Sequence, residues 1–273
     1  MMLCIFCKSD TRDSVSIEHI MPESLGNTEH VLPRGWVCDG CNNYFARKVE
    51  KPFLDSPFAT STRSIMGVPN KRGRVLPTQA LHPQSRSILE LFRCEGGWIV
   101  GAASGQDETA WIRSIRNSKG GSFWLPTPTV VPEANVHTAR FIGKIALEAL
   151  AAQCKDIEGW NAELVSHPTF DPLRNYVRLG APAITWPVST RGIYDRERRF
   201  NDHAIEDYEI LHEWMILATD GGEYYCVVAI FGVEFAINLC GPQLDGWNAW
   251  LIAHGMRSPL LDAPSKESRG AGK

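Results

Sequence analysis

Four cysteines, arranged as two close pairs, constrain this chain of 273 residues more than any other feature. Cys4 and Cys7 form one C-x-x-C pair, and Cys38 and Cys41 form a second. Thiolate sulfur is a good ligand for zinc, and a gap of two residues turns both sulfurs of a pair to one side. The spacing therefore predicts a structural Zn²⁺ site that holds two segments, distant in the sequence, against each other.

Two further elements accompany the cysteines. The run Glu18-His19-Ile20-Met21-Pro22 lies between the pairs, and Asn42-Asn43 follows the last cysteine. These elements, in this order, resemble the HNH endonucleases with zinc knuckles, and the resemblance covers roughly residues 2–55. It implies a ββα-metal finger, in which a two-stranded hairpin and a following helix hold one divalent ion.

The resemblance also implies roles for individual residues. His19 would be the general base, and Glu18 and Asn42 would hold a catalytic Mg²⁺ or Mn²⁺. The chemistry of these side chains agrees, because an imidazole accepts a proton near neutral pH and hard divalent cations prefer oxygen ligands. We therefore expect metal-dependent hydrolysis of DNA phosphodiester bonds, by nicking or by double-strand cleavage.

One position departs from the family pattern. Many members have an asparagine nine residues before the position of Asn42, where it braces the loop that aims the histidine, and this chain has Pro33 there. Backbone carbonyls near residues 32–35 would then orient the imidazole. Asn27 and His30 are polar candidates nearby, and the spacing selects neither. A zinc-stabilised module that binds DNA without cutting it therefore stays an alternative.

The sequence predicts an α+β fold. An N-terminal ββα-metal domain (1–58) would be followed by a basic linker (59–80), a mixed α+β domain of unknown role (81–264) and a disordered tail (265–273). Within the first domain, a helix should run from near Asn42 and end before Pro52, since proline lacks an N–H and clashes with the preceding turn.

The second domain contains one clear helix and one clear hairpin. Residues 136–153 carry apolar residues at helical spacing, with Arg140, Lys144 and Glu148 interleaved, and predict the central helix. Residues 208–219 and 224–239 predict a C-terminal strand pair around Asp220-Gly221-Gly222. Residues 88–131 suggest small strands, and the proline-rich residues 155–206 suggest irregular structure.

Overall charge says little about partners, because the formal net charge is only -3. DNA binding must therefore depend on local clusters of basic residues. Candidates for contacts with phosphates are the predicted helix and linker residues Arg47, Lys48, Lys51, Lys71, Arg72 and Arg74. Two clusters are candidates for facing DNA, namely Arg63 with the basic residues of 71–74, and Arg191 with 196–199. Solvated loops are the competing interpretation for the linker and for Arg191 with 196–199.

Other features of the sequence bear on location and regulation. No run of eighteen apolar residues predicts a membrane span, and the cysteines Cys94, Cys154, Cys226 and Cys240 sit singly, as is typical of a reduced cytoplasmic protein. The C-terminal domain could bind a protein partner or a small-molecule trigger that gates the nuclease, which is a third hypothesis. The family resemblance suggests a setting in bacterial anti-phage defence or mobile-element biology.

Overall fold

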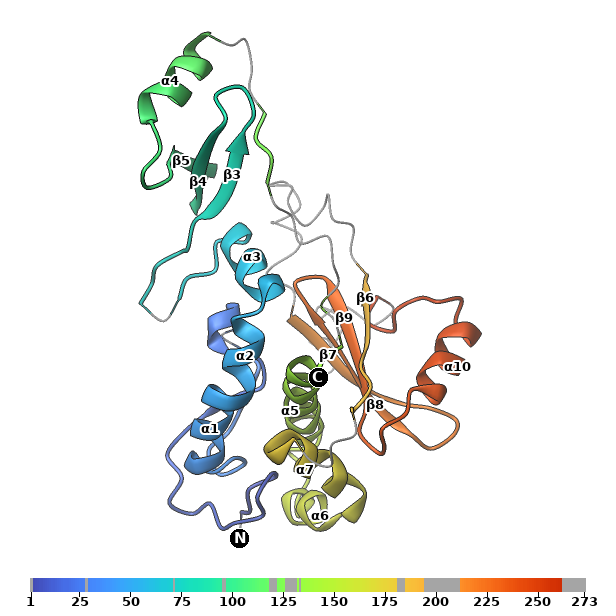
Figure 1. The fold of residues 1–273 in the computed structure, drawn as a ribbon. Helices are drawn as coiled ribbons and strands as arrows, with labels where there is room; N and C mark the ends of the chain where they lie inside the picture. The colour runs from blue at the N-terminus through green and yellow to red at the C-terminus, as the bar shows by residue number, and fades with distance from the viewer. Residues whose placement is uncertain are drawn as a thin grey trace, which may run out of the picture.

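The structure is a computed structural model that describes residues 2–27, 29–70, 72–94, 97–117, 122–125, 132, 134–180, 185–193 and 212–261. It confirms the α+β class (Figure 1). Its strands are β1 (Glu18–His19), β2 (Val31–Leu32), β3 (Thr78–His82), β4 (Ser87–Cys94), β5 (Gly97–Ala102), β6 (Ser189–Gly192), β7 (His212–Ala218), β8 (Tyr224–Ile230) and β9 (Val233–Asn238). Its helices are α1 (Asp39–Phe45), α2 (Lys51–Leu54), α3 (Pro57–Ile65), α4 (Glu108–Asn117), α5 (Val136–Gln153), α6 (Trp160–Ser166), α7 (Asp171–Leu179) and α10 (Asp245–Ala253).

The N-terminal unit has the predicted order of strand, strand and helix. β1 and β2 pair antiparallel, with Glu18 opposite Leu32 and His19 opposite Val31. α1 starts just after Cys38, whose sulfur accepts the backbone N–H of Cys41 at 3.4 Å. The second cysteine pair therefore also caps the helix.

The predicted end of this helix before Pro52 is wrong. A π-helical segment, Ala46–Glu50, follows α1 directly and leads into α2. Pro52 lies in the first turn of α2, where a missing N–H is tolerated because the wide π turn has already changed the hydrogen-bond register. The helical path therefore continues past the proline toward α3.

Helix α5 has the predicted bounds and lies at the centre of the fold. Asn135 caps it by accepting the backbone N–H groups of His137 and Thr138. The helix contacts α2, α7 and strands β2, β7, β8 and β9. Figure 1 shows it between the α1–α2 column and the C-terminal sheet. α7 approaches closely at Gly143, where an added Cβ would lie 2.8 Å from a methyl group of Val177.

The C-terminal sheet is antiparallel, in the order β6-β9-β8-β7. The predicted turn at 220–222 joins β7 to β8, which confirms the hairpin over the residues described; 208–211 lie outside them. The run 224–239 is not one strand, because it reverses at Phe231 and Gly232. Their φ angles of 50° and 74° are both positive, as in a tight turn between β8 and β9.

Two predicted irregular regions contain regular structure. The expected linker 59–80 begins within α3 and ends in β3, and the proline-rich region contains α6, α7 and β6. Pro168 and Pro172 lie in the first turns of a short 3-10 helix and of α7, where proline is well tolerated. Residues 265–273 of the expected tail lie outside the part of the chain that the structure describes.

One hydrophobic core crosses the proposed boundary at residue 58. It joins the N-terminal unit to α5, α7 and the C-terminal sheet. Phe53 of α2, for example, stacks on Phe141 of α5 with ring centroids 4.1 Å apart and also meets Phe235 of β9 edge-on. The N-terminal unit is therefore packed as part of a larger body.

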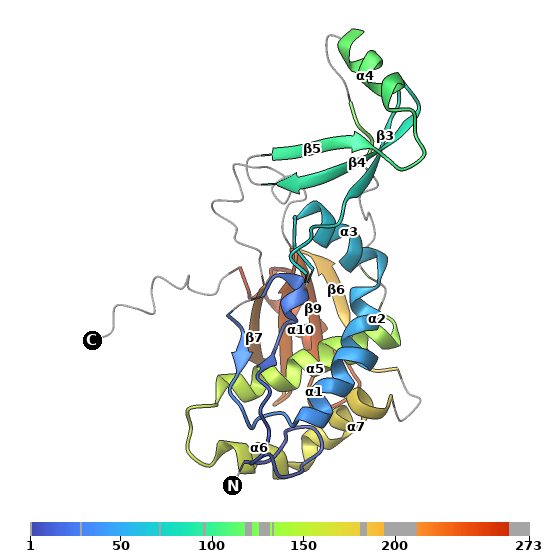
Figure 2. The ribbon, with the colours of Figure 1, turned by 90° about the vertical axis from the view of Figure 1, so that its left-hand side faces the viewer.

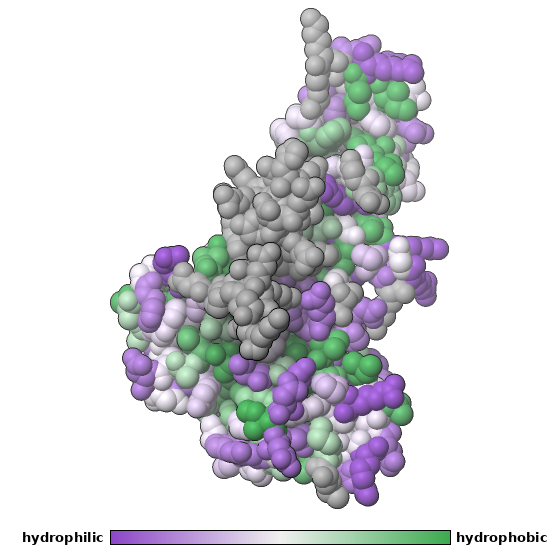
Figure 3. All heavy atoms as spheres, turned by 180° about the vertical axis from the view of Figure 1, so that it is seen from behind, coloured by the Kyte–Doolittle hydropathy of each residue, from purple (hydrophilic) through white to green (hydrophobic). Residues whose placement is uncertain are grey.

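A smaller unit protrudes from this body. β3, β4, β5 and α4 form it, and the column of α1, α2 and α3 leads to it from the N-terminal unit (Figures 1 and 2). Ala80, Leu89 and Leu91 are its core. The space-filling view in Figure 3 shows apolar residues gathered on this unit, where Ile99 is 61% and Trp124 63% exposed.

Within the described ranges, no helix has the length and apolar character to cross a membrane.

Candidate active site

The four cysteines meet as the spacing predicts. Their sulfur atoms all lie within 4.8 Å of one another, and those of Cys7 and Cys38 are 3.5 Å apart. Hydrogen bonding with the Cys41 thiol lowers the pKa of Cys4 to about 5. Burial, with the charge of Cys4, raises the pKa of Cys38 to about 11. A thiolate at one cysteine therefore disfavours a thiolate at its neighbour. A bound divalent cation offsets this repulsion between negative sulfurs, so the cluster fits zinc.

Later helices hold the first cysteine pair in place. The amide of Asn161 on α6 makes two hydrogen bonds to the backbone of Leu3, one donated and one accepted, at 3.0 and 2.9 Å. The buried guanidinium of Arg174 on α7 donates to the carbonyl oxygen of Ile5 at 2.7 Å. The knuckle before β1 therefore depends on residues far outside the motif.

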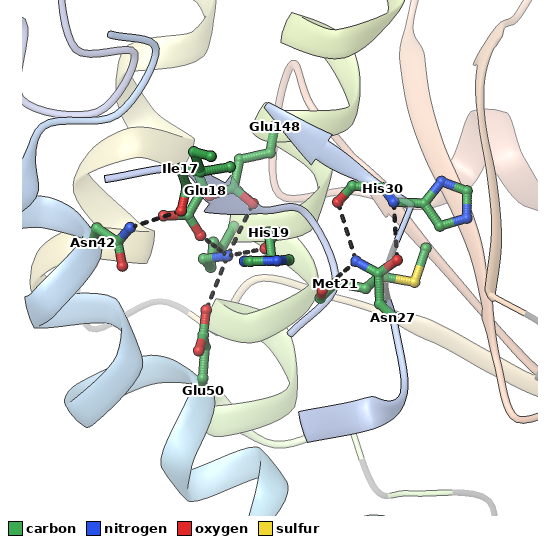
Figure 4. A network of polar contacts seen from close by, with 10 residues as sticks. Ile17, Glu18, His19, Met21, Asn27, His30, Asn42, Glu50 and Glu148 are labelled. Carbon is green, nitrogen blue, oxygen red and sulfur yellow. Dashed lines mark hydrogen bonds and ion pairs between the residues drawn. The ribbon is translucent and has the colours of Figure 1, made fainter. Parts of the chain in front are cut away.

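Glu18 and His19 occupy β1 side by side and differ in exposure. The side chain of Glu18 is only 5% exposed, whereas His19 is half-buried. Glu18 reaches into the interior, as Figure 4 shows. In the described part of the chain, the imidazole of His19 makes no hydrogen bond. The expectation that carbonyls near residues 32–35 hold the ring is therefore not met.

A buried lysine from α5 joins Glu18 to two other carboxylates. Lys144 is fully buried, and its ammonium lies 2.7 Å from Glu18, 3.0 Å from Glu50 and 2.9 Å from Glu148. It also donates to the carbonyl oxygen of His19 at 3.1 Å. Figure 4 draws this cluster at the point where β1 faces α5. Sequence reasoning missed it, although the oppositely charged i,i+4 pair Lys144 and Glu148 in an apolar helix was a signal.

The charges in this cluster strongly affect one another. Burial disfavours the ammonium of Lys144, but the carboxylates around it outweigh burial and raise its pKa well above the ordinary value. Burial raises the pKa of Glu18 and of Glu148. One oxygen of each, Oε2 of Glu18 and Oε1 of Glu148, is buried and has no hydrogen-bond partner among the residues described. A buried carboxylate oxygen in this state favours a nearby cation.

Asn27 braces the loop between β1 and β2. Its buried amide donates to the carbonyl oxygens of Met21 at 2.6 Å and His30 at 3.1 Å, and accepts the backbone N–H groups of Glu29 and His30. The His30 carbonyl also accepts the N–H of Ile20, directly after His19. Asn27 thus does the bracing expected of the asparagine that Pro33 replaces. The sequence signal was an asparagine in a short loop, where its side chain commonly accepts the backbone N–H two residues later, here that of Glu29.

Asn42 lies in the first turn of α1 and faces β1. Its side-chain N–H group donates to the carbonyl oxygen of Ile17 at 3.4 Å (Figure 4). The helix cap is Cys38, so Asn42 is not the N-cap. Its amide oxygen has no partner among the described residues. Together with Oε2 of Glu18, it offers oxygen donors of the kind that Mg²⁺ and Mn²⁺ prefer, so the chemistry of these two side chains fits such an ion.

The predicted DNA-contacting residues differ in availability. Arg47, Lys48, Arg72 and Arg74 are exposed, and Lys51 is exposed with an i,i+4 ion pair to Asp55. Lys71 and residues 196–199 lie outside the described residues. Arg191 lies on β6 and forms an ion pair with the buried Glu234 of β9, within the C-terminal sheet. Arg63 is half-buried, and burial lowers its pKa.

The C-terminal sheet contacts the hairpin loop through strand β7. The Trp214 indole donates to Nδ1 of His30 at 3.3 Å, so Nε2 of His30 carries the proton and donates to the carbonyl oxygen of His212 at 2.8 Å. Nε2 of the buried His212 in turn donates to the carbonyl oxygen of Leu25 at 2.7 Å. Burial lowers the pKa of His212 to about 4.

The geometry and the comparisons agree on the class of this unit. A cysteine-held hairpin and helix that present a histidine beside a carboxylate are typical of a ββα-metal nuclease. Residues 4–58 match the model of a family described as HNH endonuclease, which confirms the predicted resemblance for this region and indicates a nuclease that acts on DNA. No curated protein and no solved structure matches the chain.

Proposed function

We propose that the protein is a metal-dependent HNH-type endonuclease that hydrolyses phosphodiester bonds of DNA. The main support is that the region matching the HNH family also brings its four cysteines together beside a hairpin carrying Glu18 and His19. The cysteines would hold a structural zinc ion. Their role is to fix the distance between the hairpin and α1, and so between His19 and Asn42.

His19 is the proposed general base. Its imidazole is half-buried and makes no hydrogen bond in the described part of the structure, so a ring nitrogen is available to take a proton from an attacking water. Oε2 of Glu18 and the amide oxygen of Asn42 would hold the divalent ion. When bound, that ion supplies a Lewis acid that stabilises negative charge on the phosphate and on the leaving oxygen.

The exposed basic residues of the helical path would contact the DNA backbone. Arg47 and Lys48 lie on the π-helical segment that follows α1, and Arg72 and Arg74 lie between α3 and β3. Contacts with phosphates give affinity without sequence preference. We therefore propose that the N-terminal unit binds duplex DNA with little base preference.

One observation favours a second candidate, a module that binds DNA without cutting it. The Glu18 carboxylate is buried and already has Lys144 as a cationic partner. If that pair excludes a divalent ion, the finger would retain its zinc and its basic surface but would have no catalytic metal.

The test uses supercoiled plasmid and the zinc-loaded protein, either with Mg²⁺ or with no divalent cation added. Wild type should convert the plasmid to nicked or linear form only with Mg²⁺. His19→Ala should keep its zinc, keep its DNA affinity without added Mg²⁺, and lose roughly 10²- to 10⁴-fold in rate. Equal cleavage by His19→Ala would remove the base assignment. DNA binding by wild type without Mg²⁺- or Mn²⁺-dependent cleavage would support the second candidate.

A further inference from the structure

The cluster around Lys144 joins the proposed nuclease site to a helix far outside the family match. Residues 4–58 match the HNH model, whereas Lys144 belongs to α5. Its ammonium lies within 3.1 Å of four oxygen atoms, three from the N-terminal unit and one from α5 itself. An ammonium has three N–H donors, so this contact set uses its full capacity.

Two of the four contacts fall on the residues proposed for catalysis. Lys144 binds Oε1 of Glu18, which leaves Oε2 as the oxygen without a partner. It also binds the carbonyl oxygen of His19, while the next peptide N–H, that of Ile20, is bound by His30. The peptide that follows His19 is thereby held from both ends. A ligand or base held in this way loses little freedom when the reacting groups assemble.

We infer that Lys144 is a positioning residue of the nuclease site, which it serves by fixing the Glu18 carboxylate and the His19 backbone. This inference rests on the proposed function. Glu148 has a different place in the cluster, because it contacts Lys144 from the next turn of α5 and makes no hydrogen bond or ion pair with Glu18 or His19 in the described structure. A side chain that orients a metal ligand from behind commonly affects metal affinity or activity by roughly 10- to 100-fold.

The test compares Lys144→Gln with Glu148→Gln. Lys144→Gln removes the ammonium and keeps a polar side chain, whereas Glu148→Gln keeps an acceptor for Lys144 and leaves its bonds to Glu18 and His19 in place. Each zinc-loaded protein is titrated with Mn²⁺, with free Mn²⁺ followed by electron paramagnetic resonance in the absence of DNA. Plasmid nicking with Mn²⁺ is then measured for kcat and KM, and DNA affinity is measured with no Mn²⁺ or Mg²⁺ added.

Lys144→Gln should lose roughly 10- to 100-fold in Mn²⁺ affinity and in kcat, while the KM for plasmid and the DNA affinity without added Mn²⁺ stay unchanged. Glu148→Gln should stay within about threefold of wild type in Mn²⁺ affinity and kcat, a difference well below that loss. Wild-type values for Lys144→Gln, or an equal loss in both variants, would overturn the positioning role while leaving the nuclease proposal intact. A wild-type protein that neither binds Mn²⁺ nor nicks DNA would overturn both.

Lys144→Gln leaves three carboxylates in the core without an ammonium and could fail to fold. The wild-type protein then provides the deciding measurement. In protein labelled with ¹⁵N-lysine, Mn²⁺ bound to one oxygen of Glu18 would lie close to Nζ of Lys144, which binds the other oxygen. The paramagnetic ion should therefore broaden the Lys144 resonance before those of exposed lysines such as Lys48. A Lys144 signal that remains sharp at saturating Mn²⁺ would overturn the inference.

Discussion

The replacement of Asn27 by alanine tests the strongest local brace in the proposed site. The side chain makes four hydrogen bonds, of 2.6 to 3.1 Å, to backbone groups of the loop between β1 and β2. At about 1 kcal/mol net for each, their sum is about 4 kcal/mol. Glu29 is exposed, so water can replace part of this loss, and we expect Asn27→Ala to lower the free energy of unfolding by about 3 kcal/mol.

The assay is urea unfolding of zinc-loaded protein, followed by plasmid nicking under conditions where the variant is folded. Asn42→Ala is the matched control, because the side-chain hydrogen bond of Asn42 to Ile17 is long, at 3.4 Å, and exposed to solvent. It should change the unfolding free energy by less than about 0.5 kcal/mol and yet lose activity. A loss below about 1 kcal/mol for Asn27→Ala, together with wild-type nicking, would refute the bracing role.

Three further predictions concern zinc, pH and DNA. Cys7→Ser should lose bound zinc and unfold the N-terminal unit at a lower temperature than wild type, as followed by metal analysis and thermal circular dichroism. His212 is neutral when folded because burial lowers its pKa to about 4. The unfolded chain binds its proton near pH 6.5, so stability should fall by about 3 kcal/mol as pH drops from 6.5 to 4. His212→Gln should flatten this pH dependence in urea titrations. Replacing Arg47 and Lys48 by Glu should lower the slope of log K for DNA binding against log salt concentration by the equivalent of about two phosphate contacts, measured without added Mg²⁺. An unchanged slope would place the DNA elsewhere.

Patterns that depend on short-range geometry were predictable from the sequence. The two C-x-x-C pairs predicted the sulfur cluster because two residues suffice to aim both sulfurs. Residues 136–153 predicted α5 because apolar residues recur along the whole segment and Asn135 precedes it. The turn at 220–222 was predictable because two glycines follow an aspartate there.

Features that depend on tertiary contacts were not predictable. The fixed spacing from Asn42 pointed to Pro33, whereas Asn27 does the bracing, because the loop between the strands can place its asparagine at another distance in the sequence. Phe231 has a positive φ, which is not expected of a phenylalanine from the sequence. Burial of its ring against His212 stabilises the turn. The contact between Lys144 and Glu18 required knowing that α5 crosses behind β1.

The single core shared by the N-terminal unit and α5 restricts how this protein can be dissected. A fragment ending at residue 58 would lack Phe141 and Phe235, which pack against the buried ring of Phe53 in the intact chain. It would also leave Glu18 without Lys144 and the first knuckle without Asn161 and Arg174. Biochemical work on isolated pieces, and attempts to transplant the finger onto another DNA-binding protein, would therefore need to include α5, α6 and α7.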